Sequence, residues 1–161
     1  FGYNVPERAE DFERWRNHTL IGEVNDGNSF YANGGIAGHA GLFSTARDLA
    51  VLGQAMLNGG SYGKVKLYNQ EVIEDFTTPQ RFGQGFGWEL NKSWYMGDKH
   101  SEKAFGHTGF TGTQVIFDPA HELQIIVLTN KQNNGPLETG SYPSTGGLSK
   151  QIANIVYDSI Q

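Results

Sequence analysis

The chain has no cysteine among its 161 residues. This absence excludes disulfide bonds, thiolate catalysis and thiolate metal ligands together. It does not identify a cellular compartment, because many exported proteins also lack cysteine. The chain begins at Phe1 rather than at methionine and shows no signal-peptide pattern. We therefore expect that it was cut or processed from a longer protein.

Positive charge is also scarce. Twelve Lys and Arg residues stand against 17 Asp and Glu, which gives a net charge of −5, and there is no basic run. Nucleic acid and anionic membrane are therefore poor candidates as partners. Long hydrophobic runs are missing as well. The longest, residues 123–128, has the length of a strand rather than of a membrane span.

Glycine, by contrast, is abundant, at 22 of 161 residues, and it occurs in clusters without a regular period. Such clusters mark tight turns and close backbone approaches. They suit an active-site face built from loops, and they suit any other loop-rich domain equally well. The hydrophobic content of 37% and the charged content of 18% are those of an ordinary globular chain of one domain's length.

Two helices are predicted after an irregular, polar entry segment at residues 1–33, which has room for one short helix. Ser44 or Thr45 caps the first, with Asp48 placed as in a capping box, and the Asn-Gly-Gly at 58–60 ends it. Its apolar face comprises Ala46, Leu49, Ala50, Gly53, Met56 and Leu57. The second helix starts at Asn69, carries Val72, Ile73 and Phe76, and ends before Pro79.

From about residue 85 the pattern changes to strands. Four are predicted, at residues 86–90, 104–107, 113–117 and 123–129, and residues 118–122 form the turn of an antiparallel hairpin between the last two. The last strand is apolar on both faces, so we expect it to be covered on both sides. A loop or mobile connection at 133–144 leads to a closing helix at 145–159, whose predicted apolar stripe is Leu148, Ile152, Ile155, Val156 and Ile160.

The order of these elements predicts an α+β fold with an antiparallel sheet of about four strands and helices packed on it. We divide the chain into the entry segment at 1–33, a helical part at 34–82, a sheet at 83–130, and a loop with the closing helix at 131–161.

The segment at 104–113, Ala-Phe-Gly-His-Thr-Gly-Phe-Thr-Gly-Thr, carries the clearest chemical signal. A basic residue, a hydroxyl and a glycine follow one another in His107-Thr108-Gly109. They place a cation, a hydrogen-bond donor and an open backbone edge side by side. Such a group can hold an acyl group and a carboxylate.

This tripeptide resembles the third active-site motif of the penicillin-recognising serine hydrolases, which include serine β-lactamases, D-Ala-D-Ala carboxypeptidases and related esterases. Four further stretches are similar to blocks of that family in the same order: residues 34–50, Gly85-Phe-Gly-Trp88, residues 116–119 and residues 126–130. Gly22-Glu-Val and Asp26 resemble a subgroup described as penicillin-binding proteins of low molecular mass. The resemblance covers roughly residues 20–160, and it implies the C-terminal part of the β-lactamase/transpeptidase-like fold.

The resemblance implies roles for individual residues. His107 stands where the family usually has lysine, and a protonated imidazole supplies similar positive potential but titrates near neutral pH. The Thr108 hydroxyl donates to a substrate carboxylate, and Gly109 lets the substrate lie flat against the strand. The backbone N–H of Phe110 is one of two oxyanion donors. Thr111 and His39 are further candidate substrate contacts, although a histidine such as His39 in a glycine-rich loop also serves as a local hydrogen-bonding residue.

The family's nucleophile motif, Ser-x-x-Lys on a helix, has no convincing counterpart. Ser61-Tyr-Gly-Lys64 matches the pattern, but it follows Asn-Gly-Gly and contains Gly63, so it predicts a turn. Tyr31-Ala-Asn33 matches the family's Tyr-x-Asn motif but stands immediately before the Gly-Gly block, where coincidence explains it better.

Other patterns give no additional site. The isolated histidines His18, His100 and His121 predict no metal site, and no cofactor is expected. The glycines at 83–87 lack the Gly-Lys-Ser/Thr of a phosphate-binding loop.

We therefore expect the C-terminal part of a serine hydrolase that transfers acyl groups from a β-lactam, a D-Ala-D-Ala peptide or an ester, and that is inactive without its N-terminal portion. The partners would be that portion and a peptidoglycan-like substrate, in the cell envelope or at the outer face of a bacterium. Self-association through the exposed surface of the half-domain is a further expectation. Two alternatives stay open: a non-catalytic module that binds a peptidoglycan-like ligand or a partner, and a compact hydrolase that uses Ser61 and Lys64.

Overall fold

The computed structural model describes residue 10 and residues 13–160. The chain forms two compact units, Phe1–Ser44 and Thr45–Gln161.

The first unit contains one helix, α1 (Gly27–Asn33), among its described residues. The Asp26 side chain caps it by accepting a hydrogen bond of 2.7 Å from the N–H of Ser29. Gly34, at φ 64°, ends it. The Arg16 guanidinium lies 4.2 Å from the centre of the Phe30 ring and donates to the carbonyl groups of the segment before the helix. The short helix allowed for by the sequence therefore lies at the end of the entry segment.

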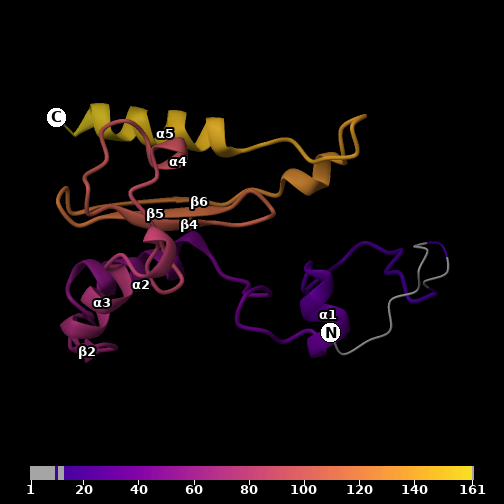
Figure 1. The fold of residues 1–161 in the computed structure, drawn as a ribbon, viewed down its shortest axis with the longest axis horizontal. Coiled ribbons are helices and arrows are strands. Elements are labelled where there is room, and N and C mark those ends of the chain that lie inside the picture. Colours follow the sequence, from indigo (N-terminus) through magenta and orange to yellow (C-terminus); the bar gives the residue numbers. More distant parts are fainter. Residues whose placement is uncertain (1–9, 11–12, 161) are drawn as a thin grey trace. The chain divides into compact units, whose positions relative to one another are not determined.

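The second unit is built around a four-stranded antiparallel sheet of strand order β3-β4-β5-β6 (Figure 1). The strands are β3 (Glu89–Leu90), β4 (Phe105–Thr108), β5 (Gln114–Asp118) and β6 (Leu123–Val127). The register of β5 and β6 pairs Asp118 with Leu123, so the predicted hairpin is confirmed.

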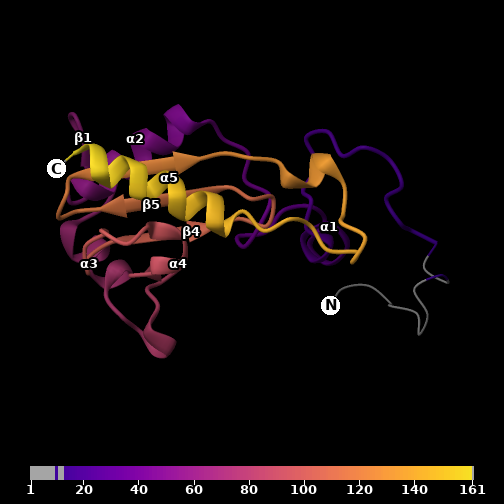
Figure 2. The same cartoon turned by 90° about the horizontal axis from the view of Figure 1, so that it is seen from above.

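Helices cover both faces of this sheet, as Figures 1 and 2 show. One face carries α4 (Ser93–Met96) and α5 (Gly146–Ser159), and the other carries α2 (Ala46–Leu57) and α3 (Gln70–Thr77). Both predicted helices in the first half of the chain are present, and Thr45 caps α2 through the N–H of Asp48 at 3.1 Å. The predicted α+β class and the cover on both sides of β6 are confirmed.

Successive side chains of each strand point to opposite faces of the sheet, so the core is divided between the two faces. Towards α4 and α5, the core contains Tyr95, Met96, Ala104, Ile116, Ile125, Ala153 and Tyr157. Towards α2 and α3, it contains Met56, Phe105 and Phe117, with Trp88 edge-on to both phenylalanine rings. Gly53 brings α2 close to the sheet, because a Cβ there would clash with the Phe117 ring.

Two sequence-based predictions were wrong in detail. Only Glu89 and Leu90 of the predicted strand at 86–90 join the sheet. In α5, Ile152 and Val156 of the predicted stripe pack against the core, but the buried residues are Ser149, Ala153 and Tyr157, and Leu148, Ile155 and Ile160 stay exposed. The structure also adds the hairpin of β1 (Ser61–Tyr62) and β2 (Val65–Lys66), which was not predicted as strands.

Within the described part of the chain, no helix has both the length and the apolar character needed to cross a membrane.

Candidate functional site

The outer edge of β4 is open at the His-Thr-Gly segment. β3 pairs only with Phe105 and Gly106, because the chain joins the sheet at Glu89, after the position opposite His107. A turn delays this entry, since Gly85 donates to the Trp88 carbonyl at 2.9 Å and Gly87 adopts φ 73°. The last two residues of β4 therefore have a strand partner on one side only.

The backbone of Thr108 points outward from this edge. Gly109 donates its N–H to the carbonyl of Thr113 at 2.7 Å, and Thr108 is opposite Gln114 in the ladder. Because hydrogen-bonded and non-hydrogen-bonded pairs alternate along an antiparallel ladder, the N–H and C=O of Thr108 face away from β5. An extended ligand can use this edge as an added strand.

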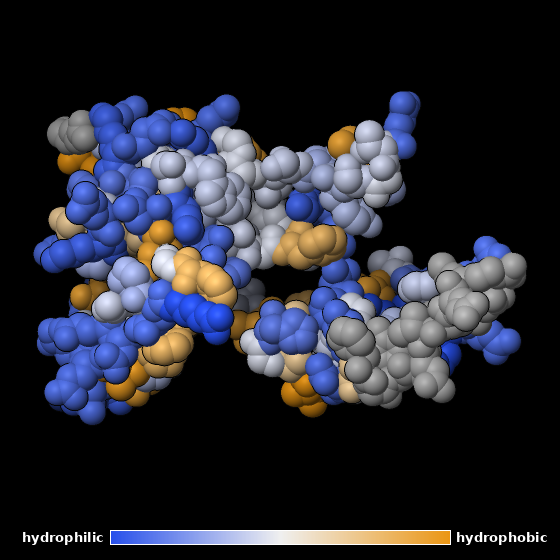
Figure 3. Space-filling model, viewed as in Figure 1, coloured by the Kyte–Doolittle hydropathy of each residue, from blue (hydrophilic) through white to orange (hydrophobic). Residues whose placement is uncertain are grey.

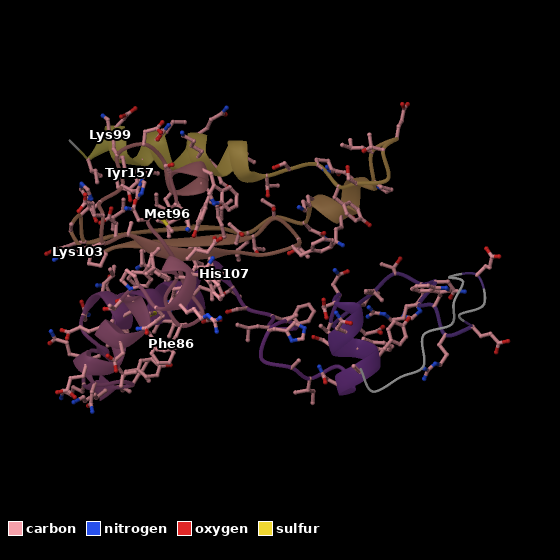
Figure 4. The ribbon with its side chains drawn as sticks, viewed as in Figure 1. Phe86, Met96, Lys99, Lys103, His107 and Tyr157 are labelled. Atoms are coloured by element: carbon pink, nitrogen blue, oxygen red, sulfur yellow. The ribbon has the colours of Figure 1, made fainter. Side chains whose placement is uncertain are left out.

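The side chain of His107 is exposed and lies on the face of the sheet opposite to α5, while Met96 and Tyr157 lie between α5 and the sheet (Figure 4). Its Nδ1 atom is 2.7 Å from the carbonyl oxygen of Thr108. A carbonyl only accepts, so Nδ1 carries a proton and donates it. The Nε2 atom is then the position at which the ring gains or loses charge.

The turn after β4 is held tightly. Gly112 donates to the carbonyl of Gly109 at 2.9 Å and adopts φ 94°, a conformation that favours glycine. A Cβ at Gly112 would lie 2.5 Å from Oγ1 of Thr129 and 2.9 Å from Cγ2 of Thr145. Glycine is therefore required here both for its backbone conformation and for the close approach of its neighbours.

Phe110 is at the tip of this turn. Its side chain is 65% exposed, although it is large and apolar. Within the described ranges its N–H has no hydrogen-bond partner. The carbonyl of the next residue, Thr111, accepts from the N–H of Lys131 at 3.0 Å, so the turn is tied to the segment after β6. The turn thus presents one free backbone donor beside Thr108.

Buried polar groups lie on the face of the sheet towards α4 and α5. Gln114, opposite Thr108, is 2% exposed, and its amide nitrogen has no partner among residues 13–160. The hydroxyl of Tyr95 is also buried and lies 3.1 Å from the position that a Cβ on Gly106 would take. Burial, together with the nearby Glu89 carboxylate, raises the pKa of Tyr95, so its hydroxyl stays protonated. Sequence reasoning missed these groups, which become neighbours only when the strands pair.

His39 belongs to the first unit and contacts residues of that unit. Its Nε2 atom is 3.1 Å from Oγ of Ser29 and 3.2 Å from Oδ1 of Asp26. The N–H of Ser29 and then the imidazole of His39 lower the pKa of Asp26.

Serine, histidine and aspartate meet at His39, but not as a catalytic triad. Both Ser29 and Asp26 contact the same nitrogen of the His39 ring, whereas in a triad the serine bonds one ring nitrogen and the carboxylate bonds the other. Ser29 is also completely buried. The group holds the start of α1 in place.

The two motif matches rejected from the sequence have structural roles. Ser61 and Lys64 belong to a tight hairpin in which Ser61 pairs with Lys66 and Gly63 adopts φ 58°. The expected turn is therefore confirmed, and the two side chains do not share a helical face. The Tyr31 hydroxyl donates to the carbonyl of Arg14 at 2.7 Å, which fastens that segment to α1.

The remaining histidines form local hydrogen bonds: His18 with Glu23, His100 with Asn91, and His121 with Asp118. No group of three or more His, Asp or Glu side chains that could hold a metal ion occurs in the described part of the chain.

The family model described as Beta-lactamase matches residues 2–143. The N-acetylmuramyl-L-alanine amidase of Bacillus subtilis is 43% identical over 147 residues, which is 88% of this chain and 33% of that protein. A putative D-alanyl-D-alanine carboxypeptidase of Escherichia coli is 44% identical over 137 residues, which is 81% of this chain and 32% of that protein. The chain thus spans about a third of the length of these relatives.

Among solved structures, a beta-lactamase from Mycobacterium bovis is similar, with a TM-score of 0.56 and 24% sequence identity. The match covers 75% of this chain and 46% of that one. At this identity the likeness concerns the fold alone.

Proposed function

Because the chain belongs to the beta-lactamase family, we propose that it forms the substrate-binding strand and turn of a serine hydrolase that acts by acyl transfer. The observation that supports this most directly is the open edge of β4, where Thr108 points its backbone outward between an exposed imidazole and a free N–H. An extended substrate lies along this edge as an additional strand.

Each residue of the segment has a role in this proposal. The Thr108 hydroxyl donates to a substrate carboxylate, and the His107 imidazolium adds positive potential. Gly109 leaves room for the substrate backbone. The N–H of Phe110 donates to the oxyanion that forms in the transition state, and loss of such a donor costs about 2.7–4 kcal/mol. The Thr111 hydroxyl is an additional substrate contact, while such a role for His39 stays a prediction.

We place the nucleophile and its base outside this chain. The hairpin at Ser61–Lys66 supports this, since it removes the one Ser-x-x-Lys sequence from a helical setting. We further propose substrates of the cell envelope: a peptide ending in D-Ala-D-Ala, a β-lactam or a simple ester. The names of the relatives, an amidase and a carboxypeptidase, motivate this choice and an envelope location.

The same hairpin favours a second candidate, a binding module that holds a peptidoglycan-like ligand without cleaving it. Both candidates predict reversible binding to this chain. The two candidates make different predictions for a longer protein that contains the chain, because only the enzyme forms a serine ester with its substrate.

Two measurements on the isolated chain test the proposal. Titration with an acylated D-Ala-D-Ala peptide is expected to show reversible binding that Thr108→Val weakens about tenfold through the loss of a charge-assisted hydrogen bond. Thr139→Val, in an exposed loop, is the matched control. Fluorescent penicillin is expected to leave the isolated chain unlabelled. Equal binding by both variants would contradict the role of Thr108, and stoichiometric labelling would show that the nucleophile is in the chain after all.

A further inference from the structure

The turn after β4 carries a positive charge that the sequence did not indicate. Lys131 follows β6 and opens a short 3-10 helix, Lys131–Asn134. Its N–H donates to the carbonyl of Thr111 at 3.0 Å, and its Nζ atom lies 5.6 Å from the centre of the Phe110 ring. Both the backbone and the side chain of Lys131 are thus fixed to the turn that follows Thr108.

Lys131 also lacks a counter-ion among the residues that the structure describes. Two other lysines of the same unit are neutralised, since Lys99 pairs with Asp158 at 2.7 Å and Lys150 pairs with Asp98 at 2.6 Å. Lys131 differs from the remaining lysines of the unit in its cation–π contact with the Phe110 ring. An uncompensated ammonium beside a partly apolar surface attracts an anion. Since no carboxylate of the described residues pairs with Lys131, its ammonium is open to a carboxylate of a ligand.

Two aromatic rings lie next to this charge. Phe110 and Tyr142 meet edge to face, with ring centres 6.1 Å apart and an angle of 85° between the planes. Tyr142 comes from the loop that precedes α5, so three separate segments build the group. Aromatic faces accept apolar groups and the alkyl part of a peptide side chain at a small cost in entropy. The three residues together match a ligand in which a carboxylate stands beside an apolar group.

We propose that Lys131 supplies the permanent positive charge of the β4 site, and that Lys131, Phe110 and Tyr142 select ligands with a carboxylate beside an apolar side chain. The inference rests on the proposed function and deepens it. An imidazole changes its charge between about pH 5 and 8, whereas a lysine ammonium does not. Lys131 therefore provides an attraction for anions that His107 provides only in its protonated form.

The test compares two ligands on four forms of the chain. The ligands are an acylated D-Ala-D-Ala peptide and the same peptide with a C-terminal amide in place of the carboxylate. The forms are the unaltered chain, Lys131→Met, Lys131→Arg and Lys103→Met. Lys103 is an exposed lysine at the opposite end of β4 from His107, which makes it a matched control (Figure 4). Circular dichroism checks that each variant folds.

Lys131→Met is expected to bind the carboxylate peptide about fivefold more weakly, as the loss of a partly exposed charge pair predicts, and to bind the amide unchanged. Lys131→Arg and Lys103→Met should bind both ligands like the unaltered chain, and added salt should reduce the preference for the carboxylate. Unchanged carboxylate binding by Lys131→Met would overturn this inference and leave the proposed function standing. Absence of any peptide binding to the unaltered chain would overturn both.

Discussion

The Nδ1 atom of His107 donates a hydrogen bond to the carbonyl oxygen of Thr108, its neighbour in the chain, at 2.7 Å. This bond exists whether or not Nε2 is protonated, because Nδ1 is a donor in both states. The ring therefore keeps its orientation when its charge changes. The hydrogen bond thereby fixes the position of the imidazole independently of its charge.

The His107 side chain is expected to contribute to ligand binding through its positive potential. His107→Gln should bind a carboxylate peptide up to about fivefold more weakly than the unaltered chain, and His107→Lys should bind it at least as tightly. His18→Gln, in the first unit, is the control. Equal binding by the unaltered chain, His107→Gln and His107→Lys would contradict this role of His107.

Gly112→Ala is expected to destroy the turn on which the site depends. Its Cβ would meet Thr129 and Thr145, and its φ of 94° is strained for alanine. Gly140→Ala is the control, because Gly140 has a similar φ of 77° but no atom within 4 Å of the added Cβ. We expect Gly112→Ala to lower the unfolding free energy by about 2–4 kcal/mol and Gly140→Ala by about 1 kcal/mol. Chemical denaturation measures both, and equal losses would show that the close approach at Gly112 is unimportant.

Gly53→Ala tests the packing of α2 on the sheet. The added methyl group would clash with the Phe117 ring and the Gln124 side chain, so the helix has to move outward. We expect a loss of about 1–3 kcal/mol in the unfolding free energy, despite the better helix propensity of alanine.

Gly147→Ala is the control for this substitution, because it lies in α5 with no atom within 4 Å of the new Cβ. Its unfolding free energy should stay the same or rise by up to about 1 kcal/mol. A stabilised Gly53→Ala variant would contradict the observed packing of α2.

The sequence predicted the elements that have a clear period or cap. Thr45 with Asp48, and the turn between β5 and β6, are local signals that need no tertiary contact. The stripe of α5 was correct only for Ile152 and Val156, which pack against the core. The most buried positions of α5 are instead taken by small and polar side chains, since Tyr157 donates to Asp118 at 2.9 Å and Ala153 fits against the core. That choice depends on residues far away in the sequence.

The candidate site likewise combines features with a local sequence signal and features that depend on tertiary contacts. The motif at 107–109 could be recognised from local sequence, whereas Lys131 and Tyr142 approach Phe110 only through the fold. The strand predicted at 86–90 begins only at Glu89 because Gly87 turns the chain, and this is also what opens the edge of β4. Single-sequence periodicity cannot show where a strand loses its partner.

Asp118 is expected to make stability depend on pH in the acid range. Burial alone would raise its pKa, but hydrogen bonds from the hydroxyl and N–H of Ser101, and then from His121 and Tyr157, outweigh burial and lower the pKa. A carboxyl with a lowered pKa in the folded state stabilises the fold fully above its ordinary value of 3.8, and this contribution is lost as pH falls below it.

Asp118→Asn should therefore lower the unfolding free energy at neutral pH by about 2–4 kcal/mol and flatten its dependence on pH below about pH 4. Denaturation curves at several pH values measure this. Asp158→Asn, on the surface in a pair with Lys99, should cost less than about 1 kcal/mol. A fall in stability at acid pH that is as steep in Asp118→Asn as in the unaltered chain would refute the assignment.

Exposed apolar residues predict self-association of the isolated chain. Leu148 and Ile155 of α5 are 50% and 68% exposed and lie seven positions apart, on one side of the helix. Apolar residues also reach the surface over the layer of α2 and α3 (Figure 3). Replacing Leu148 and Ile155 by Glu should shift the chain towards monomer in sedimentation velocity. Val51→Glu, on α2, tests in the same way whether the opposite helical layer takes part in self-association. A chain that is monomeric at all concentrations would contradict this prediction.

The most direct test of the central claim is a map of ligand contacts by nuclear magnetic resonance. The backbone amides of the chain would be followed during titration with an acylated D-Ala-D-Ala peptide. The account predicts that the amides of Thr108 and Phe110 shift first and most strongly, because the ligand joins the open edge of β4 and its carbonyl approaches the free N–H. Saturable shifts confined to other parts of the chain, or no shifts at millimolar peptide, would contradict it.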